Sequence, residues 1–115
     1  GSVGGSVLVL GISFKENVPD LRNSKVADLI AGLASRGHKV VAHDPHVDRT
    51  EAMSEYGLSI DDAALDSTYD LVVLAVPHAE YLEWGAKRLL ALTEDTGLFA
   101  DLRNALPGQV GIWRL

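Results

Sequence analysis

The sequence predicts an α/β fold in which helices cover both faces of a mainly parallel sheet. Short apolar runs rich in Val, Leu and Ile recur along the chain, and between them lie segments whose apolar residues repeat every three or four positions. Strands that alternate with helices form parallel sheets through crossover connections, which place helices on both faces. With 115 residues, of which 47% are hydrophobic, the chain is long enough for one such domain.

The first strand is expected at residues 6–12, because SVLVLGI is apolar at almost every position, as buried strands are. After a polar loop, a helix is expected at residues 24–36. Asn23 or Ser24 can cap this helix, and Gly37 can end it. The apolar face of the helix is expected to consist of Val26, Ala27, Leu29, Ile30, Leu33 and Ala34.

The middle of the chain repeats the same order. The run KVVAH at residues 39–43 predicts a second strand, and residues 49–56 predict a short helix stopped by a glycine. Residues 61–65 are expected to form a helical turn. The strongly apolar run YDLVVLAV at residues 69–76 predicts a third strand, which Pro77 ends.

The last part of the chain predicts one long helix and two short strands. The helix is expected at residues 79–92, and the strands at residues 97–100 and at residues 110–113, the latter at an edge of the sheet. The inward-facing residues of the helix are expected to be Tyr81, Leu82, Leu89 and Leu92.

Composition excludes several classes of function. The net charge is −6, whereas binding to nucleic acid or to an anionic membrane surface needs a basic face. The chain has no cysteine, so it contains no disulfide, no thiolate metal site and no cysteine nucleophile. No apolar run approaches the roughly 20 residues of a membrane-spanning helix.

Side chains that follow the predicted strands are the candidates for ligand binding, because open parallel sheets bind ligands outside the carboxyl ends of their strands. Two of them, Lys15 and Arg103, are cations that can meet an anion on an otherwise acidic protein. The complete set is Lys15, Asp44, His46, His78, Asp101 and Arg103.

The loop after the first strand lacks the glycines of a dinucleotide-binding domain. The fingerprint G-x-G-x-x-G lets the backbone approach a pyrophosphate, but here Gly11 is followed by Ile, Ser, Phe and Lys. The phosphate-binding pattern G-x-x-x-x-G-K-[ST] is also missing. Any diphosphate would therefore be held by side chains, for which Lys15 offers a point charge and Arg22 a planar fork.

The stretch VLGISFKENVPDLRNSKV, residues 9–26, closely resembles the start of the C-terminal, UDP-sugar-binding domain of the nucleotide-sugar 6-dehydrogenases. This is the family of UDP-glucose dehydrogenase and GDP-mannose dehydrogenase. The shared pattern is a strand that ends in glycine, then F-K, then D-x-R-x-S leading into a helix. The later stretches AHDPHV, DLVVLAVPH and FADLRN follow in the same order, so the resemblance covers residues 7–115.

Within the family, KENVPDLRNS resembles the branch that acts on UDP-N-acetylhexosamines and makes UDP-aminouronic acids for surface polysaccharides. The same domain of UDP-glucose 6-dehydrogenase remains an alternative. The resemblance implies a Rossmann-like three-layer sandwich with a mainly parallel sheet. It also implies that Phe14, Lys15 and Arg103 contact the UDP-sugar, and that Arg22 touches NAD bound mainly by another domain.

The resemblance further implies that the chain is a fragment of a longer dehydrogenase. Residues 1–2 are interpreted as remnants of cloning and residues 3–115 as one UDP-sugar-binding domain. The catalytic cysteine belongs to the N-terminal half in this family, so the isolated chain is expected to be inactive, with no catalytic residue and no metal ligand. The expected partners are a UDP-sugar and the N-terminal NAD-binding domain of the same full-length chain, with no nucleic acid or membrane. The full-length enzyme is expected to be a cytoplasmic homo-oligomer.

Two further classes of function are considered. One alternative is a freestanding nucleotide-binding or regulatory module of Rossmann type. An upstream half with a cysteine motif in the encoding locus would favour the dehydrogenase over this alternative. A flavodoxin-like or receiver-like signalling domain is disfavoured. Such a domain would need acidic residues where Ser13 and Pro77 stand.

Several candidates have structural interpretations beside the functional ones. Asp44 is favoured as a strand-end turn residue, His43 as a core histidine and His78 as a capping or packing residue. His43, His46 and Asp48 resemble a metal cluster, but that interpretation is disfavoured. Trp84 and Trp113 are interpreted as core or domain-interface residues, and the structural alternative for Arg103, which is not favoured, is a partner for Asp101.

Overall fold

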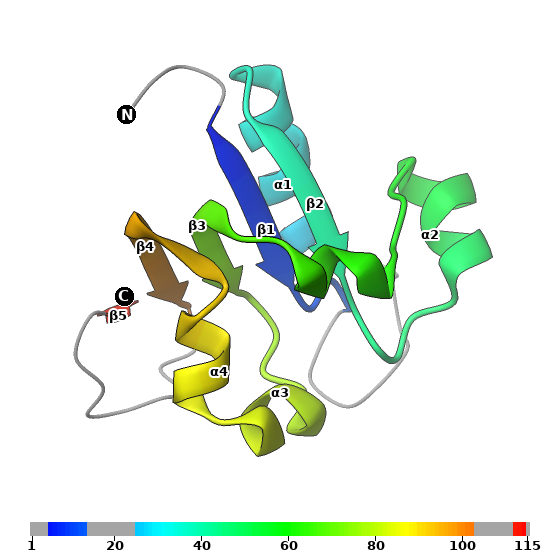
Figure 1. The fold of residues 1–115 in the computed structure, drawn as a ribbon. Coiled ribbons are helices and arrows are strands. Elements are labelled where there is room, and N and C mark those ends of the chain that lie inside the picture. The colour runs from blue at the N-terminus through cyan, green and yellow to red at the C-terminus, as the bar shows by residue number, and fades with distance from the viewer. Residues whose placement is uncertain (1–4, 14–24, 103–111, 115) are drawn as a thin grey trace.

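The computed structural model describes residues 5–13, 25–102 and 112–114. Its centre is a five-stranded sheet in the order β2-β1-β3-β4-β5, in which every neighbouring pair is parallel (Figure 1). The α/β fold class with a parallel sheet is thereby confirmed. The strands are β1 (Ser6–Leu10), β2 (Lys39–His43), β3 (Tyr69–Leu74), β4 (Thr93–Asp101) and β5 (Ile112–Arg114).

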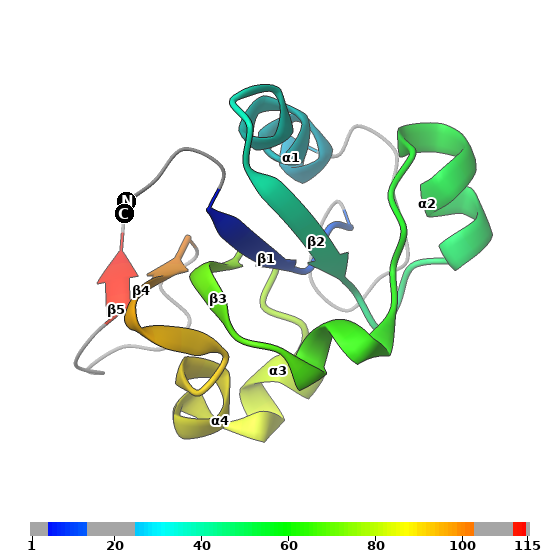
Figure 2. The ribbon, with the colours of Figure 1, turned by 45° about the horizontal axis from the view of Figure 1, so that its top comes forward.

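Helices cover both faces of the sheet. Figure 2 shows α1 on one side of the strands and α3 with α4 on the other, so the domain has three layers. The helix α2 lies beyond β2, and the segment that follows it runs along β2 through a bridge between Ile60 and Ala42. The helical segments are α1 (Lys25–Ser35), α2 (Arg49–Tyr56), the 3-10 helix η1 (Asp62–Asp66), α3 (Ala79–Trp84) and α4 (Ala86–Leu90). None of the helices in the described ranges is long and apolar enough to cross a membrane.

Alternation along the strands divides the core in two. Val7 and Val9 of β1 face Ile30 of α1, whereas Leu8 and Leu10 pack in the other cluster with Tyr81 of α3. This is the two-residue period of a strand buried on both faces. The apolar sequence of β1 therefore supplies both layers at once.

The prediction of one long helix at residues 79–92 is wrong. Gly85 divides this segment into α3 and α4, because its φ of 84° and ψ of 156° form a conformation that is essentially confined to glycine. Leu82, within α3, is 42% exposed and does not face inward as predicted, while Tyr81, Leu89 and Leu92 are buried as predicted.

The strand predicted at residues 97–100 is longer, because β4 already begins at Thr93. Its first half carries exposed polar residues and pairs with β3 through a register shift, so no apolar pattern marks it. The edge strand predicted at residues 110–113 is present, at Ile112–Arg114.

The helix predicted at residues 24–36 is present as α1, but its apolar face is narrower than predicted. Ala27 and Ile30 are buried, whereas Leu29 is 36% exposed and Ala34 is exposed. Beside Leu29, α1 and the sheet enclose an apolar hollow of about 240 Å³. Its lining consists of Leu29, Leu33, Leu71, Val73, Leu98, Ala100 and Leu102.

Gly11 is the turn from β1 into the following loop, and its position permits no side chain. Its φ is 87°, and a Cβ atom here would lie 2.5 Å from the carbonyl oxygen of Val76 and 2.7 Å from the Val76 Cβ. The chain that leaves β3 therefore packs directly on the backbone of the chain that leaves β1. Glycine serves close packing between two strand ends at this position.

Replacing Gly11 with Ala should lower the free energy of unfolding by about 3 kcal/mol, since left-handed strain and a backbone clash add together. Urea denaturation would measure this change. Gly32→Ala is the matched control, because Gly32 lies within α1 and a Cβ there meets nothing within 4 Å. That substitution should stabilise the protein by about 0.5–1 kcal/mol. A Gly11→Ala protein as stable as the parent would contradict this packing.

Candidate functional site

The carboxyl ends of four strands form one straight edge of the sheet. By strand register, His43 of β2, Leu10 of β1, Leu74 of β3 and Asp101 of β4 stand side by side. In this strand order the topological switch point, where open sheets bind ligands, lies between β1 and β3. A ligand-binding site is therefore expected at the segments that follow these two strands.

Asp44, the first residue after β2, binds backbone groups of two different segments. Its Oδ2 accepts hydrogen bonds from the N–H groups of Ile12 (2.8 Å) and Ser13 (3.2 Å), just beyond β1. Its Oδ1 accepts from the N–H groups of His46 (2.8 Å) and Val47 (3.2 Å), in the turn after β2. One carboxylate thus fixes the chain as it leaves both strands.

His78, which follows β3, completes the link to the third strand. It is fully buried, and its Nε2 lies 2.8 Å from Oδ2 of Asp44 and 3.2 Å from Oγ of Ser13. Because a carboxylate can only accept, Nε2 must carry the proton and donate it. The structural interpretation of His78 as a packing residue holds, with a hydrogen bond to Asp44 added to the packing.

Asp44 remains ionised although it is only 4% exposed. Burial, the largest influence, would raise the pKa of its carboxyl group. Hydrogen bonds from His78 and from the backbone N–H groups of Ile12 and His46 outweigh burial and hold this pKa below its ordinary value. A buried charge that is this fully hydrogen-bonded is stable only in one geometry.

Ser13, His78 and Asp44 do not form a nucleophilic triad. In such a triad the two imidazole nitrogens face different partners, one the nucleophile and one the acid. Here the same nitrogen, Nε2, faces both Ser13 and Asp44. The group therefore has the chemistry of a structural clamp and cannot accept a proton from Ser13.

A second brace joins β2 to α3. The hydroxyl of Tyr81 donates to the carbonyl oxygen of His43 (2.9 Å) and lies 2.8 Å from Nδ1 of the same residue. The same carbonyl oxygen accepts the N–H of Gly11 (2.8 Å). The other ring nitrogen of His43 lies 3.1 Å from Oδ1 of Asp62. Burial lowers the pKa of His43, although the hydrogen bond and the charge of Asp62 act against it. The interpretation of His43 as a core histidine with satisfied hydrogen bonds is confirmed.

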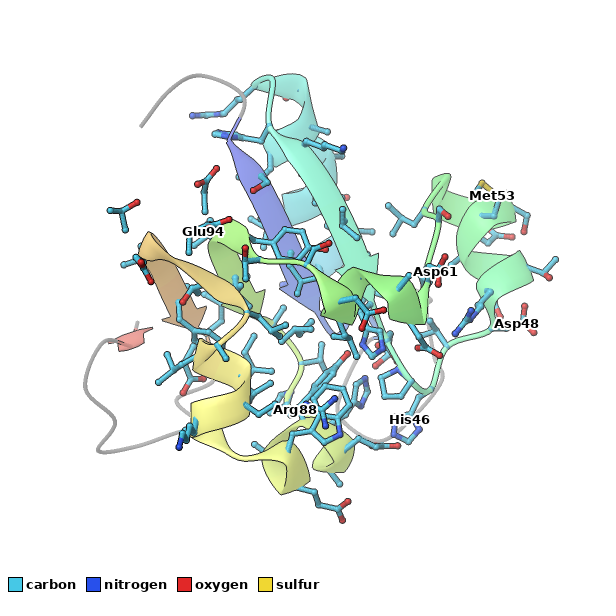
Figure 3. All side chains as sticks on the ribbon, in the orientation of Figure 1. His46, Asp48, Met53, Asp61, Arg88 and Glu94 are labelled. Atoms are coloured by element: carbon cyan, nitrogen blue, oxygen red, sulfur yellow. The ribbon has the colours of Figure 1, made fainter. Side chains whose placement is uncertain are left out.

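The residues of the considered metal cluster serve separate purposes. Nε2 of His46 lies 2.8 Å from Oε1 of Glu80, and its ring centroid lies 4.5 Å from that of His78 (His46 is labelled in Figure 3). Asp48 caps α2 by accepting the N–H of Glu51 at 2.8 Å. Within residues 5–13, 25–102 and 112–114, no group of three His, Asp or Glu side chains could hold a metal ion.

The tryptophan of α3 is half-buried and lies beside this brace. Its ring centroid is 5.1 Å from that of Tyr81, and the guanidinium carbon of Arg88 lies 4.8 Å from the centroid of the Trp84 ring. Trp84 thus belongs to the core beneath α3 and α4, in agreement with one of its two interpretations. The side chain of Trp113 lies outside the described side chains.

The four predicted ligand contacts, Phe14, Lys15, Arg22 and Arg103, lie outside the described residues. The flanking residues are described, however. Ser13 precedes Phe14 and Lys15 and is held by Asp44, and Asp101, at the end of β4, is fully buried two positions before Arg103. Their roles remain predictions.

Sequence reasoning underestimated Asp44. It was interpreted as a turn residue, and it does bind its own turn, but its hydrogen bonds to Ile12, Ser13 and His78 join residues 31 to 34 positions apart. Tyr81 was identified as an inward residue without its hydrogen bonds to His43. A polar residue directly after each of two neighbouring apolar strands was the available signal.

Gly11 also decides whether the loop after β1 could cradle the pyrophosphate of NAD. A backbone cradle needs glycines that leave room for the ligand. The space above Gly11 is instead occupied by Val76, and no other glycine lies between residues 11 and 32. The backbone at Gly11 therefore leaves no room for a pyrophosphate.

The chain belongs to the UDP-glucose/GDP-mannose dehydrogenase family, whose UDP-binding domain matches residues 8–108. It is 36% identical over 112 residues to the UDP-N-acetyl-D-glucosamine 6-dehydrogenase of Salmonella typhi. This match covers 97% of this chain and 26% of that protein. It is 39% identical over 103 residues to the enzyme of the same name from Pseudomonas aeruginosa, over 90% of this chain and 24% of that protein. The chain thus spans about a quarter of the length of these relatives.

Solved structures agree on the fold. The UDP-N-acetyl-mannosamine dehydrogenase Cap5O of S. aureus superposes with a TM-score of 0.70 and 22% identity. The match covers 96% of this chain and 26% of that one. This confirms the three-layer α/β architecture expected for the UDP-binding domain of the family.

Replacing Asp44 with Asn should lower the free energy of unfolding by about 3 kcal/mol near neutral pH, because an amide nitrogen cannot accept the backbone hydrogen bonds. The folded-state pKa of Asp44 lies below its unfolded value. Its stabilisation is therefore complete above the unfolded pKa and is lost as pH falls through the folded one. Urea denaturation over a series of pH values should show the two proteins converging below about pH 4.

Asp48→Asn is the matched control for this experiment, because Asp48 is also an aspartate that accepts a backbone hydrogen bond. Asn caps helices about as well as Asp, so this variant should stay within about 0.5 kcal/mol of the parent. A stability difference for Asp44→Asn that does not shrink in acid would contradict the assignment of a buried, ionised carboxylate.

Proposed function

We propose that residues 3–115 form the UDP-sugar-binding domain of an NAD-dependent UDP-N-acetylhexosamine 6-dehydrogenase. The whole enzyme would oxidise the C6 alcohol of the sugar to a carboxylate in two NAD-dependent steps, and so make a UDP-aminouronic acid for surface polysaccharide in the cytoplasm. The observation that carries the proposal is the aligned carboxyl edge of the sheet in a chain that matches the family's UDP-binding domain.

Chain geometry supports a shared diphosphate site for Lys15 and Arg103. Each follows a buried residue of the edge, Ser13 or Asp101, by two positions, which is at most about 8 Å of backbone. The strands β1 and β4 are separated only by β3, so their ends lie roughly 10 Å apart. Two long cationic side chains that leave these ends can reach one diphosphate from both sides.

The sugar of the substrate is proposed to be an N-acetylhexosamine. Two relatives with 36% and 39% identity are named as UDP-N-acetyl-D-glucosamine 6-dehydrogenases, which supports the N-acetylhexosamine branch. The stretch KENVPDLRNS, residues 15–24, supports the same branch. UDP-glucose is the alternative substrate.

Catalysis would depend on the rest of the enzyme. The chain contains no cysteine, and its first loop has no glycine cradle for NAD, so the N-terminal domain of the same polypeptide would supply the nucleophile and bind most of the cofactor. Arg22 would reach that cofactor from this domain. The full-length enzyme is proposed to be a homo-oligomer, and the isolated chain is proposed to reduce no NAD.

The isolated chain should bind UDP weakly, with a dissociation constant on the order of millimolar, and more tightly at low salt. Each charge-assisted hydrogen bond contributes roughly 1.5–3 kcal/mol, and an open site loses part of this to water and ions. NMR titration should shift amide signals of residues 14–16 and 101–104. Lys15→Ala and Arg103→Ala should each weaken binding and reduce its dependence on salt.

Lys87→Ala is the control for the loss of one positive charge, because Lys87 is exposed on α4. It should leave UDP binding unchanged. Shifts confined to α2 and residue 57, or none at high UDP concentration, would show that the site is not at the carboxyl edge.

In the full-length enzyme, Arg22→Ala should raise the apparent Michaelis constant for NAD and leave the binding of the UDP-sugar nearly intact. Arg22 precedes the first helix by three positions in the sequence, and the resemblance to the family assigns it to the cofactor. Steady-state kinetics with each ligand varied in turn would measure both effects. An equal loss for both ligands would count against the assignment of Arg22 to the cofactor.

A further inference from the structure

We propose that Asp44 and His78 are positioning residues for the UDP site, because they fix the backbone of Ile12 and Ser13 from which Phe14 and Lys15 follow. The proposal rests on the proposed function and adds two residues that contact no ligand themselves. It assigns a role in binding to a buried pair whose hydrogen bond measures 2.8 Å.

The pair acts on the switch point of the sheet from both sides. Asp44 comes from the end of β2 and His78 from the end of β3, and both bind the segment that follows β1, the strand between them. The N–H groups of Ile12 and Ser13 donate to Asp44, and the hydroxyl of Ser13 lies within hydrogen-bond distance of His78. Both N–H groups of the two residues after Gly11 donate to the same oxygen of Asp44. One oxygen atom of Asp44 therefore holds two consecutive backbone N–H groups of the chain that leaves β1.

His78 controls that atom. Its Nε2–H donates to Oδ2 of Asp44, which also accepts from Ile12 and Ser13, and it lies within 3.2 Å of the Ser13 hydroxyl oxygen. Loss of this donor would leave Oδ2 with one fewer hydrogen bond in a site closed to water. Asp44 would then rotate or draw in solvent, and the backbone at Ser13 would move with it.

The surroundings argue against a role in stability alone. Ile12, which follows β1, and Ala75 and Val76, which precede His78 in the chain, are buried and apolar. An apolar replacement of a buried polar pair is often no less stable. What an apolar pair could not provide is a fixed direction for two backbone N–H groups. Side-chain recognition of a diphosphate needs such a fixed platform, because Lys15 has several rotatable bonds beyond its backbone.

The donor property of residue 78 can be tested by a pair of substitutions. His78→Leu removes the donor and keeps an apolar side chain of similar size, whereas His78→Gln keeps an N–H donor at a comparable distance from the backbone. Asp44→Asn alters the acceptor. Asp48→Asn makes the same chemical change at the N-cap of α2, where the side chain accepts the N–H of Glu51, and serves as control.

The experiment uses the 115-residue chain and UDP as the probe. Two quantities are measured for each protein that retains a cooperative unfolding transition. They are the dissociation constant for UDP and, without ligand, the hydrogen-exchange rates of the Ile12 and Ser13 amides. His78→Leu and Asp44→Asn should weaken UDP binding about tenfold and accelerate exchange at both amides. His78→Gln should bind UDP with a dissociation constant within about threefold of the parent value. The control, Asp48→Asn, should have the dissociation constant of the parent.

Three results would overturn the proposal. If His78→Leu exchanges faster at Ile12 and Ser13 but binds UDP like the parent, the pair is structural only. If His78→Gln binds UDP as weakly as His78→Leu, hydrogen-bond donation is not what residue 78 contributes to binding. If the parent chain binds no UDP, the proposed function fails and this proposal falls with it. The last result is distinct from the first two, in which the parent protein binds.

Discussion

The carboxylate of Asp44 is the group whose hydrogen bonds hold together the segments at the carboxyl edge of the sheet. Five donors converge on its two oxygens, and they come from the segments that follow β1, β2 and β3. Burial of a charge is unfavourable unless every hydrogen-bonding position is filled, so the arrangement tolerates little displacement of any donor. His78 and Tyr81 extend the same constraint to α3.

This constraint is the basis on which the proposed UDP site would work without a glycine-rich loop. A glycine loop recognises phosphate through backbone N–H groups that lie directly against the ligand. In this chain the N–H groups after β1 are turned inward to Asp44, and Gly11 is packed against Val76. In the proposed site, recognition falls to side chains farther along the chain, such as Lys15, and these need a rigid point of departure.

The sequence predicted the fold well because the signal for strands and helices is local. Buried strands such as β1 and β3 are marked by their own apolar residues, whatever they pack against. The helix break at Gly85 was missed because a glycine within a helical pattern signals a break only when its dihedral angles are known. The role of Asp44 was missed for another reason. A bond to His78 spans 34 positions, and no local pattern reports which buried groups meet across a sheet.

A crystal structure of the chain with bound UDP would test the central claim most directly. The diphosphate is predicted to lie at the carboxyl edge, between the ends of β1 and β4, with the hydrogen bond between Asp44 and His78 unchanged. UDP bound elsewhere, for example in the hollow of about 680 Å³ that Lys39 and Tyr69 line beside β2, would contradict the claim. So would UDP at the edge with the bond between Asp44 and His78 broken.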